Sequence, residues 1–149
     1  RRCVPKSIKE AQNRWYLIGY DLDREDFRNY GLDRITNFEI TSSKKATPNI
    51  NINNEYKNAF GIETYGEPTT ILIKFENSQK EYIKSLPFHP SQKIMEENEK
   101  SFMTELFMLP TYDFRMELLK YGDQCEVVEP KKLRDEMKAI VVNLSKMYK

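Results

Sequence analysis

Near the start of the chain, two extended runs with apolar and aromatic residues, Arg14–Tyr20 and Phe27–Tyr30, flank a polar segment. Both runs are rich in aromatic and β-branched residues, which favour strands. The segment between them, Asp21–Asp26, is acidic apart from Leu22 and Arg24, and its six residues are too many for a two-residue turn. The pattern therefore predicts a β-hairpin with a polar loop.

The first strand of this hairpin carries bulky residues on both of its faces. Because side chains alternate along a strand, Trp15 and Leu17 lie on one face and Tyr16 lies on the other. Bulk on both faces is typical of a small barrel, and we expect Trp15 to belong to its core. Whether Arg28 shares a face with Tyr16 or with Trp15 depends on the register of the hairpin, which the sequence leaves open.

The pattern weakens after the hairpin. Thr36–Ser43 alternates weakly and predicts one further strand, and Ser42–Asn54 has the Lys, Asn and Ser content of a linker. Asn54 is a suitable N-cap for a short helix over Glu55–Phe60, which Gly61 would end. We place a domain boundary in this region.

The second half of the chain predicts the element order β-α-β-β-α-β, followed by a helix. The expected strands are Thr70–Phe75, Lys93–Glu97, Ser101–Leu109 and Gln124–Glu129. The expected helices are Gln79–Leu86, Tyr112–Tyr121 and Lys131–Tyr148. Apolar residues of the last helix recur at helical spacing, and we expect all of them to face the core: Leu133, Met137, Ile140, Val141, Leu144 and Tyr148. Two β-α-β units that share one sheet make a ferredoxin-like α+β domain.

Charge is distributed unevenly along the 149 residues. Residues 1–60 hold 11 Lys and Arg against 8 Asp and Glu, whereas residues 61–149 hold 13 against 15, and six of the eight arginines precede residue 35. Arginine interleaved with aromatic residues on strands is suited to phosphates and flat bases. The alternative is an ordinary hairpin with solvated arginines on its outer face. Non-specific binding of duplex DNA would need a broader basic stripe.

Residues for catalysis or metal binding are few. The two cysteines, Cys3 and Cys125, are far apart and form no C-x-x-C motif, so we expect no zinc site and a reducing, cytoplasmic compartment. The single histidine, His89, lies in a turn bounded by proline and is expected to make local hydrogen bonds. No glycine-rich phosphate loop and no apolar run of membrane-spanning length occur. We expect neither an enzyme nor a cofactor.

Several motifs together resemble a known family. In the first half these are Trp15-Tyr16-Leu17, Gly19-Tyr20-Asp21, Arg28-x-Tyr30 and Leu32-Asp33-Arg34-Ile35, which resemble the signature of the WYL domain. The second half resembles the C-terminal extension that often follows WYL domains, through Phe88-His89-Pro90-Ser91-Gln92 and Gly122-x-x-x-Glu126-Val127-x-x-Pro130-x-x-Leu133. Many members carry a basic residue before the Leu-Asp-Arg motif, where this chain has Gly31.

The resemblance implies a fold and a function. WYL domains occur in bacterial transcriptional regulators, usually behind a DNA-binding winged helix. The implied fold is α+β: a partial Sm/SH3-like β-barrel over residues 1–53, a connector with a short helix over 54–67, and a ferredoxin-like domain with a C-terminal helix over 68–149. We expect the first barrel strand and the DNA-binding region to be missing, so that promoter DNA is contacted only through that missing part. A strand edge left unpaired recruits a neighbour, and we expect a homodimer.

The expected function is to sense a nucleotide or a short single-stranded nucleic acid and to transmit its binding through the dimer arrangement. Arg28 and Arg34 are the candidates for phosphate contacts, and Tyr16 is the candidate for stacking or a hydroxyl contact. Arg14 and Arg2 are second choices. An alternative is a dimerisation module with no small ligand. A third hypothesis, an RNA-binding Sm-like protein acting alone, fits the barrel but leaves the second domain unexplained.

Overall fold

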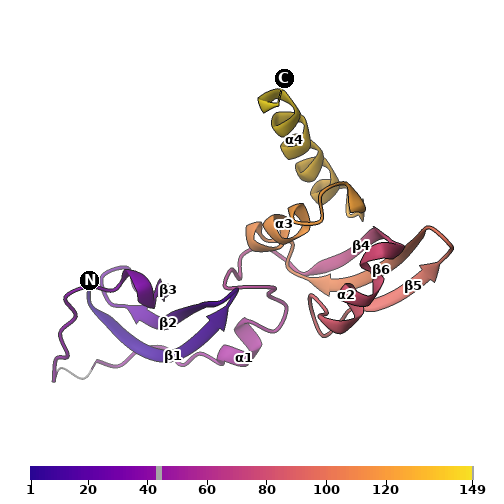
Figure 1. Ribbon diagram of the computed structural model, residues 1–149. Coiled ribbons are helices and arrows are strands. Elements are labelled where there is room, and N and C mark those ends of the chain that lie inside the picture. Colours follow the sequence, from indigo (N-terminus) through magenta and orange to yellow (C-terminus); the bar gives the residue numbers. More distant parts are fainter. Residues whose placement is uncertain (43–44, 149) are drawn as a thin grey trace. The chain divides into compact units, whose positions relative to one another are not determined.

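The structure is a computed structural model that describes residues 1–42 and 45–148 (Figure 1). The chain divides into two compact units, Arg1–Lys57 and Asn58–Lys149. The first unit holds a three-stranded sheet, and the second holds a four-stranded antiparallel sheet with helices. The α+β fold predicted from the sequence, a barrel-like part followed by a ferredoxin-like domain, is confirmed.

The sheet of the first unit has the strand order β1-β2-β3. Its strands are β1 (Cys3–Ala11), β2 (Arg14–Asp21) and β3 (Asp26–Gly31), followed by the 3₁₀ turn η1 (Leu32–Arg34). Gln12 and Asn13 have φ angles of 51° and 62°, so β1 and β2 are joined by the left-handed two-residue turn that suits the twist of a hairpin. The predicted hairpin of β2 and β3, with its longer loop, is present.

The predicted strand over Thr36–Ser43 is wrong for the residues described. Thr36–Ser42 forms no strand, and both Phe38 and Ile40 are exposed, while Ser43 lies outside the described residues. Two alternating apolar residues do not make a strand unless a neighbouring strand supplies hydrogen bonds. The short helix α1 covers Ile52–Glu55, three residues before its predicted start, because Oδ1 of Asn51 rather than Asn54 caps it.

The sheet of the second unit has the strand order β5-β6-β4-β7, with all neighbouring strands antiparallel. Its strands are β4 (Thr69–Glu76), β5 (Lys93–Glu97), β6 (Ser101–Met108) and β7 (Cys125–Glu129). Its helices are α2 (Lys80–Ser85), α3 (Tyr112–Leu119) and α4 (Lys131–Met147), with 3₁₀ turns η2 (Asn77–Gln79) and η3 (Gly122–Gln124). This order is that of a ferredoxin-like fold, as the element pattern predicted.

One face of this sheet forms the core of the second unit. Alternate residues of β4 and β6 point to that face and are buried with residues of α2, α3, β7 and α4: Ile71, Ile73, Phe75, Phe102, Leu106, Met108, Ile83, Phe114, Leu118, Val127 and Leu133. The ring of Phe75 stacks on Phe102 and on Phe88, with centroids 5.7 Å and 6.0 Å apart. Burial of each such side chain stabilises the fold by about 1.5 to 3 kcal/mol.

The segment before β4 is attached to this unit by specific contacts. The ring of Phe60 packs against Phe88 and Phe114. The carboxylate of Asp113, in the first turn of α3, accepts hydrogen bonds from the backbone N–H groups of Ile62 and Glu63 at 3.0 and 3.3 Å. Because Glu63 in turn accepts the N–H of Asp113 at 3.1 Å, the start of α3 is capped by a segment fifty residues upstream.

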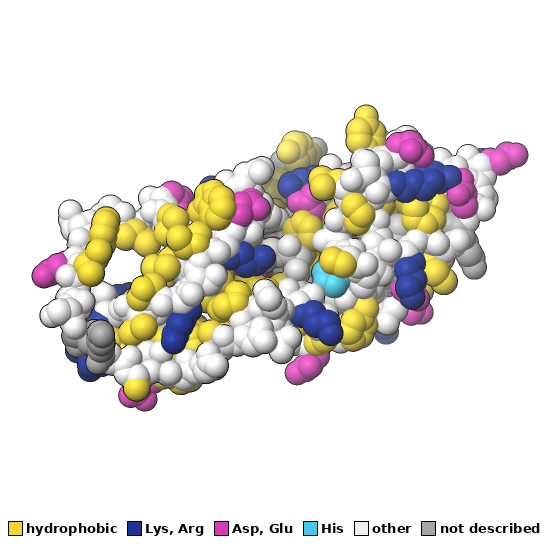
Figure 2. Space-filling view, turned by 90° about the horizontal axis from the view of Figure 1, so that it is seen from below, with side chains coloured by type: hydrophobic (Ala, Val, Ile, Leu, Met, Phe, Trp, Pro, Cys, Tyr) yellow, Lys and Arg dark blue, Asp and Glu magenta, His cyan; other side chains and the backbone are white. Residues whose placement is uncertain are grey.

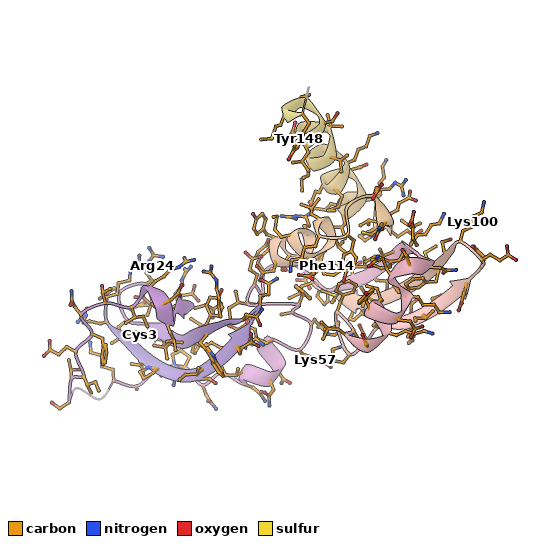
Figure 3. All side chains as sticks on the ribbon, viewed as in Figure 1. Cys3, Arg24, Lys57, Lys100, Phe114 and Tyr148 are labelled. Atoms are coloured by element: carbon orange, nitrogen blue, oxygen red, sulfur yellow. The ribbon has the colours of Figure 1, made fainter. Side chains whose placement is uncertain are left out.

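The C-terminal half of α4 extends beyond the sheet (Figure 1), and Tyr148 lies at its far end, away from Phe114 in the core (Figure 3). The prediction that the whole apolar stripe faces the core is therefore wrong. Leu133 is buried, but Leu144 and Tyr148 are exposed, as is Val141. The reason is length: the 17 residues of α4 span about 25 Å, whereas the five residues of β7 span about 17 Å.

Candidate functional site

The register of the first sheet decides which residues share a face. Gly19 of β2 lies opposite Arg28 of β3, and Leu17 lies opposite Tyr30. Residues directly opposite each other in an antiparallel pair point to the same face. Arg28 therefore shares a face with Trp15 and Leu17, and we name this surface the Arg28 face. Tyr16 lies opposite Gly31 on the other side of the sheet, the Tyr16 face.

Trp15 is exposed on the Arg28 face, so the prediction that it belongs to the core is wrong. Its exposed fraction is 57%, and that of its neighbour Ile8 on β1 is also 57%. A side chain on the face of a sheet is buried only when a second layer packs on that face. The exposure of Trp15 and Ile8 shows that no element of the described residues covers them. An exposed indole on the same face as Arg28 is available to a flat ligand.

The strand that carries Arg28 is anchored by the buried carboxylate of Asp21. One oxygen of Asp21 accepts the backbone N–H groups of Asp23 and Arg24 at 2.9 and 3.1 Å, and the other accepts the hydroxyl of Tyr30 at 2.8 Å. The Tyr30 hydrogen bond is the main cause that lowers the pKa of Asp21, assisted by the two N–H groups. Burial and the neighbouring carboxylate raise the pKa of Tyr30 to about 12, so Tyr30 remains a donor.

Gly19 leaves room for the thiol of Cys3 on the Arg28 face. A Cβ atom at this position would collide with Sγ of Cys3 on β1, so the thiol occupies the space where a side chain would be. Cys3 is a free, half-buried cysteine whose thiol pKa is raised by burial and by the nearby Asp21 carboxylate. Arg28 consequently has no side chain directly opposite it on β2.

Three of the four predicted arginines are paired with carboxylates. Arg28 lies 2.9 Å from Asp26, and Arg14 lies 3.6 Å from Asp33. The guanidinium of Arg2 donates two hydrogen bonds to Asp23, at 2.7 and 3.0 Å. All of these side chains are partly exposed, and exposed pairs of this kind contribute about 0 to 1 kcal/mol. An incoming phosphate can therefore replace the carboxylate at low cost.

The fourth arginine, Arg34, is exposed in η1 and forms no ion pair among the residues that the structure describes. It follows Asp33, the partner of Arg14, so these two arginines lie at the Trp15 end of the sheet. Arg2 and Arg28 lie nearer the loop that joins β2 to β3. The four predicted arginines thus form two groups, and Tyr16 lies on the other face, so the five predicted site residues do not converge on one pocket in the part of the chain that the structure describes. On the face shown in Figure 2, lysine and arginine side chains are scattered among acidic ones.

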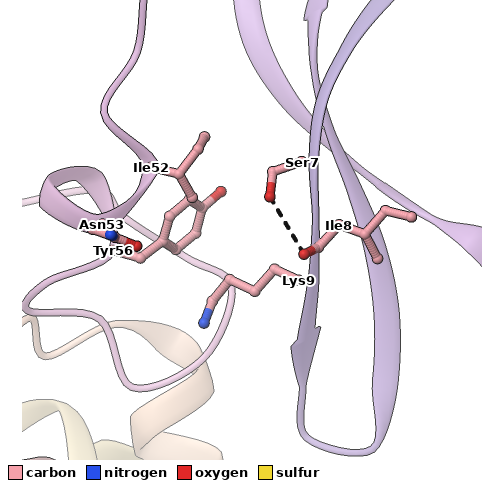
Figure 4. Close-up of a pocket in the computed structure, with 6 residues that line it drawn as sticks. All are labelled: Ser7, Ile8, Lys9, Ile52, Asn53 and Tyr56. Atoms are coloured by element: carbon pink, nitrogen blue, oxygen red, sulfur yellow. Dashed lines mark hydrogen bonds between the residues drawn. The ribbon is translucent and has the colours of Figure 1, made fainter.

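One grouping on the Tyr16 face was not predicted. Lys9, which lies opposite Tyr16, places its Nζ 5.3 Å from the ring centroid of Tyr56, just after α1. The Tyr56 hydroxyl donates to Oδ1 of Asn29 at 2.6 Å, and burial raises the pKa of Tyr56. Lys9 and Tyr56 border a hollow of about 360 Å³ (Figure 4). Nothing in the local sequence signals this contact, because Lys9 and Tyr56 are far apart along the chain.

Local hydrogen bonds account for His89, as predicted. Its Nδ1 lies 2.8 Å from the hydroxyl of Ser91, and that hydroxyl also accepts the N–H of Phe107 on β6. Within residues 1–42 and 45–148, no group of three or more His, Cys, Asp and Glu side chains is arranged to hold a metal ion. None of the described helices is long and apolar enough to cross a membrane.

Comparison with known proteins identifies both halves of the chain. The model of the WYL domain matches residues 1–40, and the model of the WCX domain matches residues 67–144, which is more than half of the chain. The chain belongs to the WCX-domain family, and its first part matches the WYL domain. The family inferred from the sequence motifs, a WYL domain with its C-terminal extension, is confirmed.

Among solved structures, the WYL–WCX chain is similar to proteasome accessory factor B/C (PafBC) of Arthrobacter aurescens. The sequence identity is 17% and the TM-score is 0.40. The match covers 92% of this chain and 21% of PafBC, so this chain spans about a fifth of the length of that protein.

Proposed function

We propose that this chain is the ligand-sensing region of a bacterial transcriptional regulator, and that its effector is a nucleotide or a short single-stranded nucleic acid bound on the Arg28 face. The observation that carries the proposal is that Trp15 and Arg28 are both exposed on this face. An aromatic ring on which bases stack and a guanidinium that binds phosphate, both on one face, are the two elements of single-strand recognition.

The spacing of these residues indicates the size of the ligand. Trp15 precedes Gly19, the residue opposite Arg28, by four positions, which is about 13 Å along a strand. A ligand that stacks on Trp15 and reaches Arg28 must span this distance. A short oligonucleotide does so more readily than a single nucleotide.

Two of the five predicted site residues, Arg28 and Arg34, have a place in this proposal. Arg28 binds a phosphate after Asp26 is displaced, and Arg34 provides positive charge at the Trp15 end. Arg14 precedes Trp15 by one residue and so lies on the Tyr16 face. Because Tyr16 lies on the other face, the stacking role belongs to Trp15.

Binding must favour one arrangement of a dimer over another if it is to change the affinity for DNA. The proposal therefore includes a homodimer, and it assigns promoter contact to a DNA-binding region outside this chain.

The test is fluorescence anisotropy of a labelled mixed-sequence single-stranded DNA of about ten nucleotides, titrated at two salt concentrations. We expect affinity to fall as salt rises, because phosphate contacts release counterions. Arg28→Ala should weaken binding about tenfold, as expected for loss of one charge-assisted contact. The matched control is Arg24→Ala, an exposed arginine of the β2–β3 loop that forms no ion pair among the described residues.

Two outcomes would contradict this function. One is no binding at low salt by a protein that is folded according to circular dichroism. The other is an affinity that Arg28→Ala leaves equal to that of Arg24→Ala.

The second candidate function is a dimerisation module with no small ligand. It is favoured by the exposed apolar residues on the C-terminal half of α4, which include Val141, Leu144 and Tyr148. An apolar contact would be insensitive to salt, unlike a phosphate contact. Sedimentation velocity over a range of protein concentrations tests it: Leu144→Asp should shift the chain toward monomer, whereas an unchanged distribution would remove α4 from the contact.

A further inference from the structure

The N-cap residue of α3, Thr111, does not cap the helix with its side chain. Its φ and ψ angles of −73° and 173° are extended, as an N-cap requires. A threonine in this position ordinarily accepts the backbone N–H of the second or third helical residue, here Asp113 or Phe114. The hydroxyl of Thr111 makes no such bond. It is fully buried and has no hydrogen-bond partner among the described residues.

The caps of α3 come instead from residues 61–65, which we name the strap. A carboxylate oxygen of Glu63 accepts the N–H of Asp113 at 3.1 Å. The hydroxyl of Tyr65 accepts the N–H of Tyr112 at 2.7 Å. Glu63 therefore takes one of the N–H groups that the N-cap hydroxyl would otherwise accept.

The strap is held on α3 mainly by one carboxylate. Asp113 accepts the N–H groups of Ile62 and Glu63 at 3.0 and 3.3 Å. A Cβ atom on Gly61 would lie 2.4 Å from Oδ2 of the same carboxylate, so a side chain there would push this oxygen away from its donors. Tyr65 is exposed and Glu63 is half-buried, so water can replace the strap's hydrogen bonds at a small net cost.

The two ways of capping α3 exclude each other. While the strap is in place, the buried Thr111 hydroxyl has no partner, which costs free energy. When the strap leaves, the N–H of Asp113 is released. Rotation of the Thr111 side chain then lets its hydroxyl accept this N–H, because the backbone of Thr111 already has the N-cap conformation. The gain at Thr111 offsets part of the loss of the strap's bonds.

We infer that the strap exchanges between a closed state, in which Glu63 and Tyr65 cap α3, and an open state, in which Thr111 caps it. Phe60, just before the strap, packs in the core on Phe88 and Phe114, so opening leaves the sheet and its helices in place.

The position of the strap gives this opening a role. The second unit begins at residue 58, so the strap lies close to the point where the chain enters it from the first unit. Opening frees residues between the Phe60 anchor and β4 and provides a hinge at this entry. All of the groups that exchange belong to the second unit, so the inference does not rest on the function proposed for the Arg28 face.

The test is native-state hydrogen exchange of the full chain, measured by NMR at the amides of Glu63 and Tyr112, which are exposed only when the strap opens. Thr111→Val removes the buried hydroxyl and keeps the shape of the side chain. It removes a cost of the closed state and a cap of the open state, so both changes favour closure. We expect exchange at these two amides to slow about tenfold.

Two further variants complete the test. Thr104→Val is the matched control, because Thr104 is an equally buried threonine of β6 whose hydroxyl donates to the carbonyl of Ile73, and it should leave exchange in the strap unchanged. Gly61→Ala displaces the Asp113 carboxylate and should speed exchange at Glu63 at least tenfold, while the amide of Leu106 in β6 exchanges as before.

The inference would be overturned by any of four results. Thr111→Val could leave exchange at Glu63 unchanged or make it faster, or Thr104→Val could slow it equally. Gly61→Ala could fail to speed it. The amides of Glu63 and Leu106 could change by the same factor in each variant, which would show global unfolding and not release of the strap.

Discussion

The guanidinium of Arg28 lies 2.9 Å from the carboxylate of Asp26, two residues earlier on the same edge strand. Both side chains are about half exposed, so the pair is weak and its partner can be exchanged. In the proposed site this carboxylate occupies the position that a phosphate of the effector takes. Asp26 thus competes with the ligand.

This competition leads to a gain-of-binding prediction. Asp26→Asn removes the competing charge and should raise the affinity for single-stranded DNA about two- to fivefold, which corresponds to a surface ion pair of up to about 1 kcal/mol. Fluorescence anisotropy measures it. Glu25→Gln is the control, because it removes a neighbouring negative charge that forms no ion pair with the described arginines. Equal gains in both variants would show a general charge effect and contradict a specific exchange at Arg28.

The hydrogen bond from Tyr30 to the buried Asp21 should stabilise the first unit. Tyr30→Phe leaves that carboxylate oxygen without its donor, and we expect a loss of about 1 to 3 kcal/mol in the free energy of unfolding. Urea unfolding followed by the fluorescence of Trp15, the single tryptophan, reports on this sheet. Tyr20→Phe is the matched control, since Tyr20 contacts Phe27 through its ring. An equal effect of both variants would argue against a special role for Asp21.

Acid should destabilise the same unit. The pKa of Asp21 is lowered from 3.8, chiefly by Tyr30, and the pKa of Asp23 is lowered from 3.8, chiefly by Arg2. A group whose pKa is lowered on folding stabilises the native state above its unfolded pKa, and this contribution is lost as the pH falls through its folded pKa. We therefore expect the urea midpoint seen by Trp15 to be level from pH 7 to about 5 and to fall below about pH 4. In Asp21→Asn the fall should be smaller, and a midpoint that is independent of pH in the wild type would contradict this reasoning.

Two leucines of α4 provide a matched pair. Leu133 is 2% exposed within the core, and Leu144 is 41% exposed on the projecting half of the same helix. Leu133→Ala should reduce the free energy of unfolding of the second unit by about 2 to 5 kcal/mol, because it leaves a cavity. Leu144→Ala should change it by less than about 0.5 kcal/mol at protein concentrations where the chain is monomeric. Chemical denaturation followed by circular dichroism measures both, and a large loss from Leu144→Ala would indicate that this part of α4 is covered.

The sequence alone determined the order and type of nearly all the elements. The hairpin of β2 and β3 follows from aromatic runs separated by aspartates, and the ferredoxin-like order follows from alternating strand and helix patterns with clear ends such as Pro110 and Gly122. The family followed from short motifs. These features depend on residues that are close together in the sequence, so the local sequence is enough to predict them.

The tertiary structure decided what the local pattern leaves open. Which face Arg28 shares is set by pairing register, and a shift of one residue would have placed it beside Tyr16 rather than Trp15. Thr36–Ser42 forms no strand, although its apolar residues alternate. The apolar residues at the end of α4 are exposed. In both cases burial requires a partner element and not only an apolar pattern. The hollow of Lys9 and Tyr56 likewise arises only when residues far apart in sequence are brought together by the fold.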